Sequence, residues 1–276
     1  MCSSDLGVAE RIGGAIGDCF HQPILPVKFD EDEDNTLPQL VIVRLAHDHC
    51  TVSVDSSGAL LHRRGYRLAS AKAPLRENLA AALLMASGWQ PQAPLMDPFC
   101  GSGTIAIEAA LLAAKIAPGK NRRFAFMDWP SYDAALWQRL LKEAAAAEQT
   151  PAAPILASDR DAGAIKLATA NAERAGVAAY IQFTHQAFSA MQPPSDPGWL
   201  VCNPPYGVRV SSAHDLRNLY AQLGHVLRAL CPGWQTGILC NSQYLIGHTG
   251  LKFPRQLNLV NGGIPVKFYM GQISHG

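Results

Sequence analysis

The 276-residue sequence predicts an α/β fold in which helices cover both faces of a parallel sheet. Three observations carry this prediction. From Pro74 onward, apolar runs of strand length alternate with helical runs. One strand leads into the glycine turn Asp97-Pro-Phe-Cys-Gly-Ser-Gly, and another leads into Asn203-Pro-Pro-Tyr-Gly. Because ligands of such sheets bind beyond the carboxyl ends of the strands, both turns are expected at the binding edge.

Before this alternating region, the sequence predicts a small α+β segment. Ile12, Ile16 and Phe20 recur at i, i+4 spacing, which is typical of a short amphipathic helix. The expected elements are a helix over 5–20, an acidic loop over 29–35, strands over 41–45 and 50–54, and a turn over 55–58. The segment is too small to bury much surface alone. Its boundary is expected near His62.

The alternating region divides into regular elements. The expected helices span 75–87, 103–115, 133–148, 162–174 and 215–230. The expected strands span 94–98, 154–158, 179–184, 198–202, 235–240, 256–260 and 265–270. Pro118-Gly119 ends the second of these helices. This order is that of a sheet with crossover helices.

Composition narrows the class of protein. Hydrophobic residues make up 48% and charged residues 16%, which is typical of a folded globular chain. No apolar run approaches the roughly 20 residues that cross a bilayer, and Met1-Cys-Ser-Ser-Asp lacks the pattern of a secretory signal, so no membrane partner and a cytoplasmic location are expected. The seven cysteines form no Cys-x-x-Cys pair, and the histidines have no ligand spacing, so no metal site is expected.

Charge is distributed unevenly. Residues 1–60 hold three Lys/Arg and ten Asp/Glu, whereas residues 61–276 hold twenty and twelve. Five cations stand between residues 62 and 76 with no acid in their midst: Arg63, Arg64, Arg67, Lys72 and Arg76. A mildly basic domain is compatible with a polyanion partner. This stretch is either a solvated face or a surface that meets phosphates.

The glycine turn admits three nucleotide interpretations. A Walker loop requires a lysine after its last glycine, but Thr104 follows Gly103. A dinucleotide site of an oxidoreductase fits Gly101-x-Gly-x-x-Ala, yet no acid follows between residues 109 and 126. Asp97 precedes the glycines, where it would repel a pyrophosphate and would suit a cation such as the amino group of a methionine moiety. The turn therefore favours S-adenosylmethionine.

Two further positions complete the candidate cofactor site. Asp159 ends the next strand, where its carboxylate can accept hydrogen bonds from ribose hydroxyls or can cap the following helix, a role for which Asp161 is better placed. Phe188 either packs on adenine or belongs to the core. Cys100 and Cys202 flank the two turns without a cationic neighbour in sequence, so packing roles are expected for them.

The second turn can hold a planar amine. The Asn203 side chain and the Pro204 carbonyl offer two acceptors for the hydrogens of an –NH₂ group, and the prolines stiffen the loop. Tyr206 can stack on a base. The alternative interpretation is a proline-stiffened turn with a core tyrosine. Together with the glycine turn, the motif indicates methyl transfer to the exocyclic nitrogen of a nucleobase, by positioning and electrostatics.

These motifs, with His62-Arg-Arg-Gly-Tyr-Arg, Pro74-Leu-Arg-Glu-Asn-Leu and the ending around Asn261-Gly262, resemble the THUMP-linked RNA methyltransferases. The similarity is greatest to 23S ribosomal RNA guanine-N2 methyltransferases of the RlmL type. The resemblance implies a Rossmann-like class I methyltransferase sheet, mostly parallel with an antiparallel last strand. It also implies that residues 1–61 are a partial THUMP-like RNA-binding segment and that residues 62–276 are the S-adenosylmethionine-dependent methyltransferase domain.

The resemblance and the reasoning from the residues together give the candidate sites. The target base would be held by Asn203, Pro204, Pro205 and Tyr206. The cofactor would be held by Asp97, Phe99, Cys100, Gly101, Ser102, Gly103, Thr104, Asp159, Arg160, Phe188 and Asn203. RNA would meet Arg63, Arg64, Arg67 and Arg209. The sequence departs from the family pattern at Gln186-Ala187, near the expected adenine, and at Val208.

Several functions stay open at this point. A guanine of 23S ribosomal RNA is the favoured target, with a transfer RNA guanine and the adenine N6 of DNA or RNA as alternatives of the same architecture. Most of the family's N-terminal RNA-binding region is missing, so a non-catalytic RNA-binding protein is a further alternative. Nothing in the sequence indicates the oligomeric state.

Overall fold

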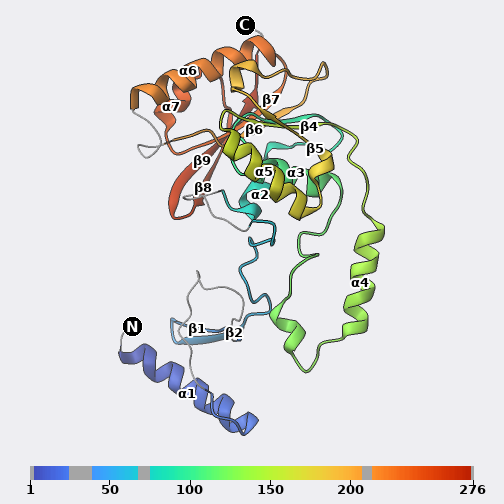
Figure 1. Cartoon of the computed structure of the whole chain (residues 1–276). Helices are drawn as coiled ribbons and strands as arrows, with labels where there is room; N and C mark the ends of the chain where they lie inside the picture. Colours follow the sequence, from blue (N-terminus) through green and yellow to red (C-terminus); the bar gives the residue numbers. More distant parts are fainter. Residues whose placement is uncertain (1–2, 25–38, 68–74, 207–212, 275–276) are drawn as a thin grey trace. The chain divides into compact units, whose positions relative to one another are not determined.

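The chain folds into two compact units, of which the computed structural model describes residues 3–24, 39–67, 75–206 and 213–274 (Figure 1). The first unit comprises Met1–Leu60 and Arg123–Tyr132, and the second comprises Leu61–Arg122 and Asp133–Gly276. The division falls beside the expected boundary at His62. The return of residues 123–132 to the first unit was not expected from the sequence.

The first unit contains one helix and one small sheet. Its elements are α1 (Ser3–Phe20), β1 (Val41–Ala46), β2 (His49–Val54) and the 3-10 turn η1 (Ala125–Asp128). Strands β1 and β2 pair antiparallel. The returning segment is attached to the β2 side of this unit, because the Phe126 N–H donates to the Ser56 carbonyl across 3.1 Å. The Trp129 indole N–H donates to the Gln39 side chain across 2.6 Å. The expected acidic loop at 29–35 lies outside the described residues.

The second unit is built on a seven-stranded sheet. Its strands are β3 (Leu95–Asp97), β4 (Ile155–Asp159), β5 (Ile181–His185), β6 (Trp199–Cys202), β7 (Gln235–Cys240), β8 (Arg255–Asn261) and β9 (Ile264–Gln272). They lie in the order β5-β4-β3-β6-β7-β9-β8. Strands β3 to β7 are parallel, whereas β9 runs antiparallel to both of its neighbours. The prediction of a mostly parallel Rossmann-like sheet with an antiparallel last strand is confirmed.

Helices cover both faces of this sheet (Figure 1). The helices of the unit are α2 (Glu77–Ser87), α3 (Thr104–Ala113), α4 (Ala134–Ala146), α5 (Ala162–Ala175), α6 (Ala213–Leu230) and α7 (Gln243–His248), with 3-10 turns η2 (Ala178–Tyr180) and η3 (Phe188–Ala190). Helix α4 contributes no residue to either apolar core of the sheet. Residues of α2, α3 and α5 form one apolar core, and residues of α6 and α7 form the other. Successive strand residues alternate between the two, as Leu239 and Cys240 do, because side chains of a strand point to opposite faces.

Short helices were harder to anticipate than long ones. Helix α7 has only six residues, which is too short for an apolar period, although Ser242 caps its first turn by accepting from the Leu245 N–H across 3.3 Å.

Within the described residues, no helix has the length and apolarity to span a membrane. The same residues contain no grouping of three or more His, Cys, Asp or Glu side chains that could hold a metal ion.

Candidate active site

The two motif turns leave the sheet from neighbouring strands. β3 and β6 pair in parallel, with Leu95 opposite Trp199 and Met96 opposite Leu200. Parallel neighbours end at the same edge, so the glycine turn after β3 and the Asn203 loop after β6 emerge side by side. β4 flanks β3 on its other side and brings Asp159 to that edge. The structure thus brings both candidate halves of the site together.

The two glycines of the first turn have different roles. Gly103 has φ +83°, and a Cβ there would lie 3.0 Å from the Ala168 Cβ of α5. Gly101 also has a left-handed φ, +51°, but a Cβ there would meet no atom within 4 Å. Gly103 therefore permits the close approach of α5, whereas Gly101 borders open space at the sheet edge.

The Asp159 carboxylate is tied to the backbone on both sides. Its Oδ2 accepts from the Gly101 N–H at 2.9 Å, and its Oδ1 accepts from the Asp161 N–H at 3.0 Å. Asp161 in turn caps α5 by accepting from the Gly163 N–H at 2.7 Å. The cap role expected for Asp161 is confirmed. Each carboxylate oxygen can accept a second hydrogen bond, so Asp159 keeps capacity for hydroxyl donors.

Asp97 is a buried carboxylate at the root of the glycine turn. It is 2% exposed, and its Oδ1 accepts from the Phe99 N–H at 3.2 Å. Burial is the main cause that raises the pKa of Asp97 to about 8; the hydrogen bond from Phe99 opposes this rise, and the negative charge of Asp159 adds to it. No ion pair with a Lys or Arg is found for it among the described residues. A cationic ligand at this edge would supply the missing counter-charge.

Among the other candidate cofactor residues, Phe99, Phe188 and Cys100 lie in or against the apolar cores, whereas Arg160 is exposed. Phe99 and Phe188 contact each other with ring centroids 5.2 Å apart, and Phe188 is a buried core residue. Cys100 is also buried in an apolar core, and burial raises the pKa of its thiol. Arg160 is exposed, and its carbonyl oxygen lies 3.1 Å from the His185 Nε2.

The hydroxyls of the turn face an arginine. Thr104 is buried, and its Oγ1 accepts from Arg67 Nη2 at 2.7 Å while lying 3.3 Å from Ser102 Oγ. The Ser102 carbonyl accepts from the buried amide of Asn171 on α5 at 2.9 Å. Arg67 and Asn171 therefore help to hold the turn in place.

The Asn203 loop is contacted by Tyr220 of α6. The Tyr220 hydroxyl of α6 lies 3.4 Å from the Pro205 carbonyl oxygen and 3.3 Å from the Cys240 Sγ of β7. Pro204 is buried, and Tyr206 is half-buried where both apolar cores meet. The Asn203 Oδ1 is buried and has no hydrogen-bond partner among the described residues. An unpaired buried acceptor is costly in a folded protein. A ligand that donates a hydrogen bond to Asn203 Oδ1 would remove this cost.

Asn261, at the end of β8, was not among the candidate residues. Its side chain is buried, and its Oδ1 has no hydrogen-bond partner among the described residues. Burial raises the pKa of the Tyr206 phenol, and the Asn261 side chain opposes this rise. In the sequence, Asn261-Gly-Gly predicts a hairpin turn, and that interpretation gives no sign of an inward-pointing amide. The one sequence signal for this residue is that Asn261-Gly262 lies in a segment on which the family resemblance rests.

Two of the arginines expected to face RNA have partners inside the protein. Arg64 Nε donates to both Glu108 oxygens, at 3.0 and 3.1 Å, and its side chain is 13% exposed. The Arg67 side chain is 9% exposed and lies 3.9 Å from Glu77 Oε1. This corrects the expectation for Arg64 and Arg67, because guanidinium groups paired with buried carboxylates are not available to phosphates. Arg209 lies outside the described residues.

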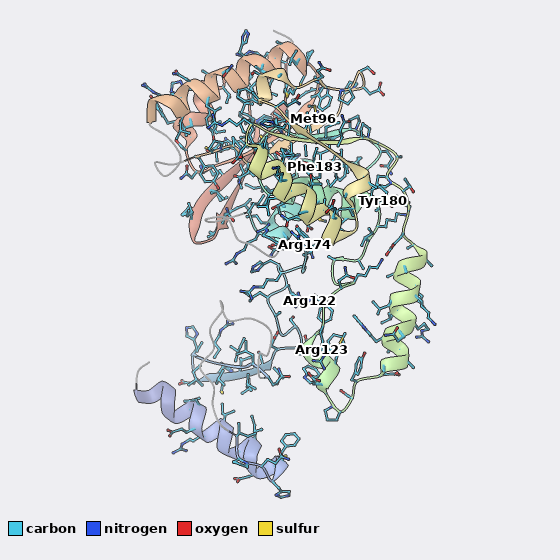
Figure 2. All side chains as sticks on the ribbon, viewed as in Figure 1. Met96, Arg122, Arg123, Arg174, Tyr180 and Phe183 are labelled. Carbon is cyan, nitrogen blue, oxygen red and sulfur yellow. The ribbon has the colours of Figure 1, made fainter. Side chains whose placement is uncertain are left out.

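Further hydrogen bonds and charges surround the Arg64–Glu108 and Arg67–Glu77 pairs. The buried Tyr66 hydroxyl donates to Glu108 Oε1 at 3.0 Å, and burial raises the pKa of that phenol. Arg174 of α5, labelled in Figure 2, donates through Nε to the Tyr66 carbonyl at 2.8 Å. Burial raises the pKa of Glu77, and the positive charges of Arg67, Arg64 and Arg63 oppose this rise. The basic stretch therefore anchors the start of the second unit to helices α2, α3 and α5.

Comparison with known proteins agrees with this geometry. Residues 64–267 match the family described as "RMKL-like, methyltransferase domain". The chain is 42% identical over 231 residues to a Synechocystis protein named "Putative RNA methyltransferase", covering 83% of this chain and 60% of that protein. It is 41% identical over 242 residues to the ribosomal RNA large subunit methyltransferase K/L of Legionella pneumophila, covering 86% of this chain and 34% of that protein. The chain thus spans only part of the length of these relatives.

A solved structure extends the likeness to three dimensions. The crystal structure of SMU.472, described as "a putative methyltransferase complexed with SAH", superposes with a TM-score of 0.81 at 32% sequence identity. The match covers 96% of this chain and 68% of that one. The similarity therefore extends over nearly the whole of this chain.

Proposed function

The chain belongs to the RMKL-like methyltransferase family, and from this membership we propose that it methylates the exocyclic 2-amino group of a guanine in 23S ribosomal RNA. The observation that carries the proposal is the buried, unpaired Oδ1 of Asn203, at the edge of the sheet where the glycine turn also ends. An acceptor in that state fits the hydrogens of an incoming amine. The ribosomal RNA methyltransferase activity in the name of the Legionella relative supports the RNA target.

S-adenosylmethionine is the proposed cofactor. A homologue of the same fold was solved with S-adenosylhomocysteine, the product of such a transfer. Asp97 would neutralise the ammonium group of the methionine moiety, and Asp159 would accept from ribose hydroxyls. Gly101 would leave room for the ligand beside the turn. When bound, the cofactor supplies a methyl group on a positively charged sulfur.

The chain's own residues would orient the amine. Asn203 Oδ1 and the Pro204 carbonyl would accept its two hydrogens, which directs the nitrogen lone pair out of the plane of the base. Tyr206 would stack on the base, a contact worth ~1–3 kcal/mol in other base–aromatic pairs. The rigid prolines and the Tyr220 contact limit motion of the loop. The base would leave its helical stack to reach this edge.

RNA contact beyond the target base is proposed for the first unit. Residues 1–61 would serve as a partial THUMP-like RNA-binding segment. Arg63 and Arg209, which belong to the second unit, are further candidate phosphate contacts. A ribosomal RNA substrate would place the reaction in the compartment that holds ribosomes, which agrees with the cytoplasmic location expected from the sequence.

Nucleoside mass spectrometry tests the proposal. We expect 23S ribosomal RNA from cells lacking the gene to lose N2-methylguanosine at one position. The purified full chain with S-adenosylmethionine should restore the modification. Loss from transfer RNA instead, or loss of N6-methyladenosine, would transfer the function to the corresponding alternative target. Unchanged nucleosides in both RNA classes, with no transfer in vitro, would contradict an enzymatic role and leave the RNA-binding alternative.

A further inference from the structure

The shortest hydrogen bond of Arg67 reaches the glycine turn and not the acidic neighbour of the arginine. Its Nη2 donates to the Thr104 hydroxyl at 2.7 Å and to the Leu75 carbonyl at 2.9 Å. Its Nε, by contrast, lies 3.9 Å from Glu77 Oε1, which is too far for a hydrogen bond. Arg67 Nε and Glu77 Oε2 are both buried and have no hydrogen-bond partner among the described residues.

This is not the arrangement of an ion pair that serves stability alone. Arginine binds a carboxylate most strongly through two parallel N–H donors, and a buried pair that stays open leaves desolvated polar atoms unpaired. The side chains of Arg67 and Glu77 are 9% and 5% exposed, so water has little access to replace the missing bonds. The guanidinium is thus placed at the Thr104 hydroxyl although this leaves the ion pair with Glu77 open.

Thr104 connects Arg67 to the rest of the turn. Its Oγ1 lies 3.3 Å from Ser102 Oγ, and both residues belong to the candidate cofactor set. A guanidinium can only donate, so Thr104 must accept from Arg67. The two hydroxyls carry two hydrogens, of which one is used in the bond between them. The other hydrogen is left for an acceptor group of a ligand.

A second route runs from the neighbouring residue Tyr66 to the same turn. The Tyr66 carbonyl accepts from Arg174 Nε at 2.8 Å, and Arg174 also donates to the side-chain oxygen of Asn171. The fully buried Asn171 amide donates to the Ser102 carbonyl at 2.9 Å. Two adjacent residues of one segment are therefore linked to the turn, Tyr66 through its backbone and Arg67 through its side chain.

We propose that Arg67 is a positioning residue of the cofactor turn, which orients the hydroxyls of Thr104 and Ser102 so that one hydroxyl hydrogen is presented to S-adenosylmethionine. The inference rests on the proposed function, because it presupposes that the cofactor binds against this turn. Arg67 acts through Thr104 and needs no contact with the cofactor or with RNA. The route through Asn171 remains when Arg67 is replaced, so the turn should lose its hydroxyl orientation and keep its place.

A double-mutant cycle at Arg67 and Thr104 tests this role. Arg67→Met keeps the apolar stem and removes the guanidinium, whereas Thr104→Val keeps the shape and removes the hydroxyl. We expect each to weaken the calorimetric affinity for S-adenosylhomocysteine roughly tenfold, the equivalent of one hydrogen bond, with the double variant no weaker than Thr104→Val alone. Thr104→Ser keeps a hydroxyl for Arg67 and should rescue the affinity.

Arg64→Met is the matched control for a loss of stability. Arg64 belongs to the same segment, and its hydrogen bonds go to Glu108 of α3. Both arginine variants leave a buried carboxylate without its cation, so both should lower the urea midpoint of unfolding. Only Arg67→Met should lower the affinity for S-adenosylhomocysteine. Should Arg67→Met fail to fold, Arg67→Lys keeps the positive charge beside Glu77, lacks the planar donor group, and is expected to show the same loss of affinity.

The outcomes distinguish this inference from the proposed function. In an active enzyme, Arg67→Lys should raise KM for S-adenosylmethionine and leave KM for RNA unchanged. Additive losses in the cycle, or equal losses of affinity in Arg64→Met and Arg67→Met, would overturn the positioning role alone. A wild type that binds S-adenosylhomocysteine but methylates no RNA would overturn the proposed function, and the calorimetric cycle would still decide the role of Arg67. A wild type without affinity for S-adenosylhomocysteine would overturn both.

Discussion

The Asp159 carboxylate accepts a hydrogen bond from the backbone N–H of Gly101, 58 residues earlier in the chain, across 2.9 Å. Its second oxygen accepts from the Asp161 N–H, where α5 begins. One side chain thus joins the glycine turn after β3, the end of β4 and the first turn of α5. The same carboxylate that would bind a ribose also sets the shape of the turn beside it.

Replacing Asp159 should therefore weaken cofactor binding through two effects. We expect Asp159→Ala to lower the calorimetric affinity for S-adenosylhomocysteine at least tenfold, since a charge-assisted acceptor is lost and Gly101 is released. Asp161→Ala is the control two residues away. It removes the α5 cap, at about 1 kcal/mol of unfolding free energy, without touching Gly101. Equal affinities for the two variants would refute the role of Asp159.

The two glycines should separate binding from stability. Gly101→Ala is expected to cost only the left-handed strain, about 1–2 kcal/mol of unfolding free energy, yet to abolish measurable cofactor binding because its methyl group enters the open space. Gly103→Ala adds overpacking against Ala168, a further ~1–3 kcal/mol. Urea unfolding and calorimetry of both variants check this. Retained binding in folded Gly101→Ala would contradict a ligand at that turn.

Much of this arrangement could be predicted from the sequence, because local patterns carry it. The strand that ends at Asp97 and the strand that ends before Asn203 are short apolar runs with distinctive turns, so the shared edge followed from the parallel order alone. The burial of Asn261 could not be predicted, since Asn261-Gly-Gly predicts an exposed hairpin turn and the inward direction of one amide depends on the surrounding fold.

The buried ion pairs of the arginines could not be predicted for a different reason. Five cations without a nearby acid suggested a surface, because sequence shows charges but not partners in space. The signal lay elsewhere in the chain. Glu108 is the only charged residue of α3, whose remaining residues are almost all Ala, Ile and Leu. A lone carboxylate on such a helix indicates a buried partner, which the structure identifies as Arg64.

Breaking that pair should destabilise the second unit. Glu108→Ala leaves Arg64 without its carboxylate and is expected to lower the unfolding free energy by about 3 kcal/mol, the lower end for a buried pair because Arg64 keeps some solvent contact. Arg139→Ala breaks the exposed pair with Glu143 on α4 and should cost no more than about 0.5 kcal/mol. Urea titrations measure both. A Glu108→Ala protein as stable as Arg139→Ala would contradict the structural role.

Asn203 should matter for turnover and not for cofactor affinity. Asn203→Ala removes the unpaired acceptor proposed to hold the amine, and we expect single-turnover methyl transfer to fall by roughly 10²–10³, as when one preorganised polar group is removed from an active site. The calorimetric affinity for S-adenosylhomocysteine should stay within a factor of about two. Normal transfer rates by the variant would remove the proposed mechanism.

Asp97 makes both folding and binding depend on pH. Its folded pKa of about 8 lies above the ordinary value of 3.8, so between these values the folded protein holds a proton that the unfolded chain has lost. Stability from this residue is therefore present at low pH, declines as pH rises through that window, and is lowest above about 8. Asp97→Asn should flatten this slope.

A bound ammonium group would favour the carboxylate, so wild-type protein should release up to one proton on binding S-adenosylhomocysteine at pH 7. Calorimetry in buffers of different ionisation enthalpy measures that proton. Because Asp97→Asn has no proton to release, a buffer dependence shared by both proteins would show that the proton comes from elsewhere.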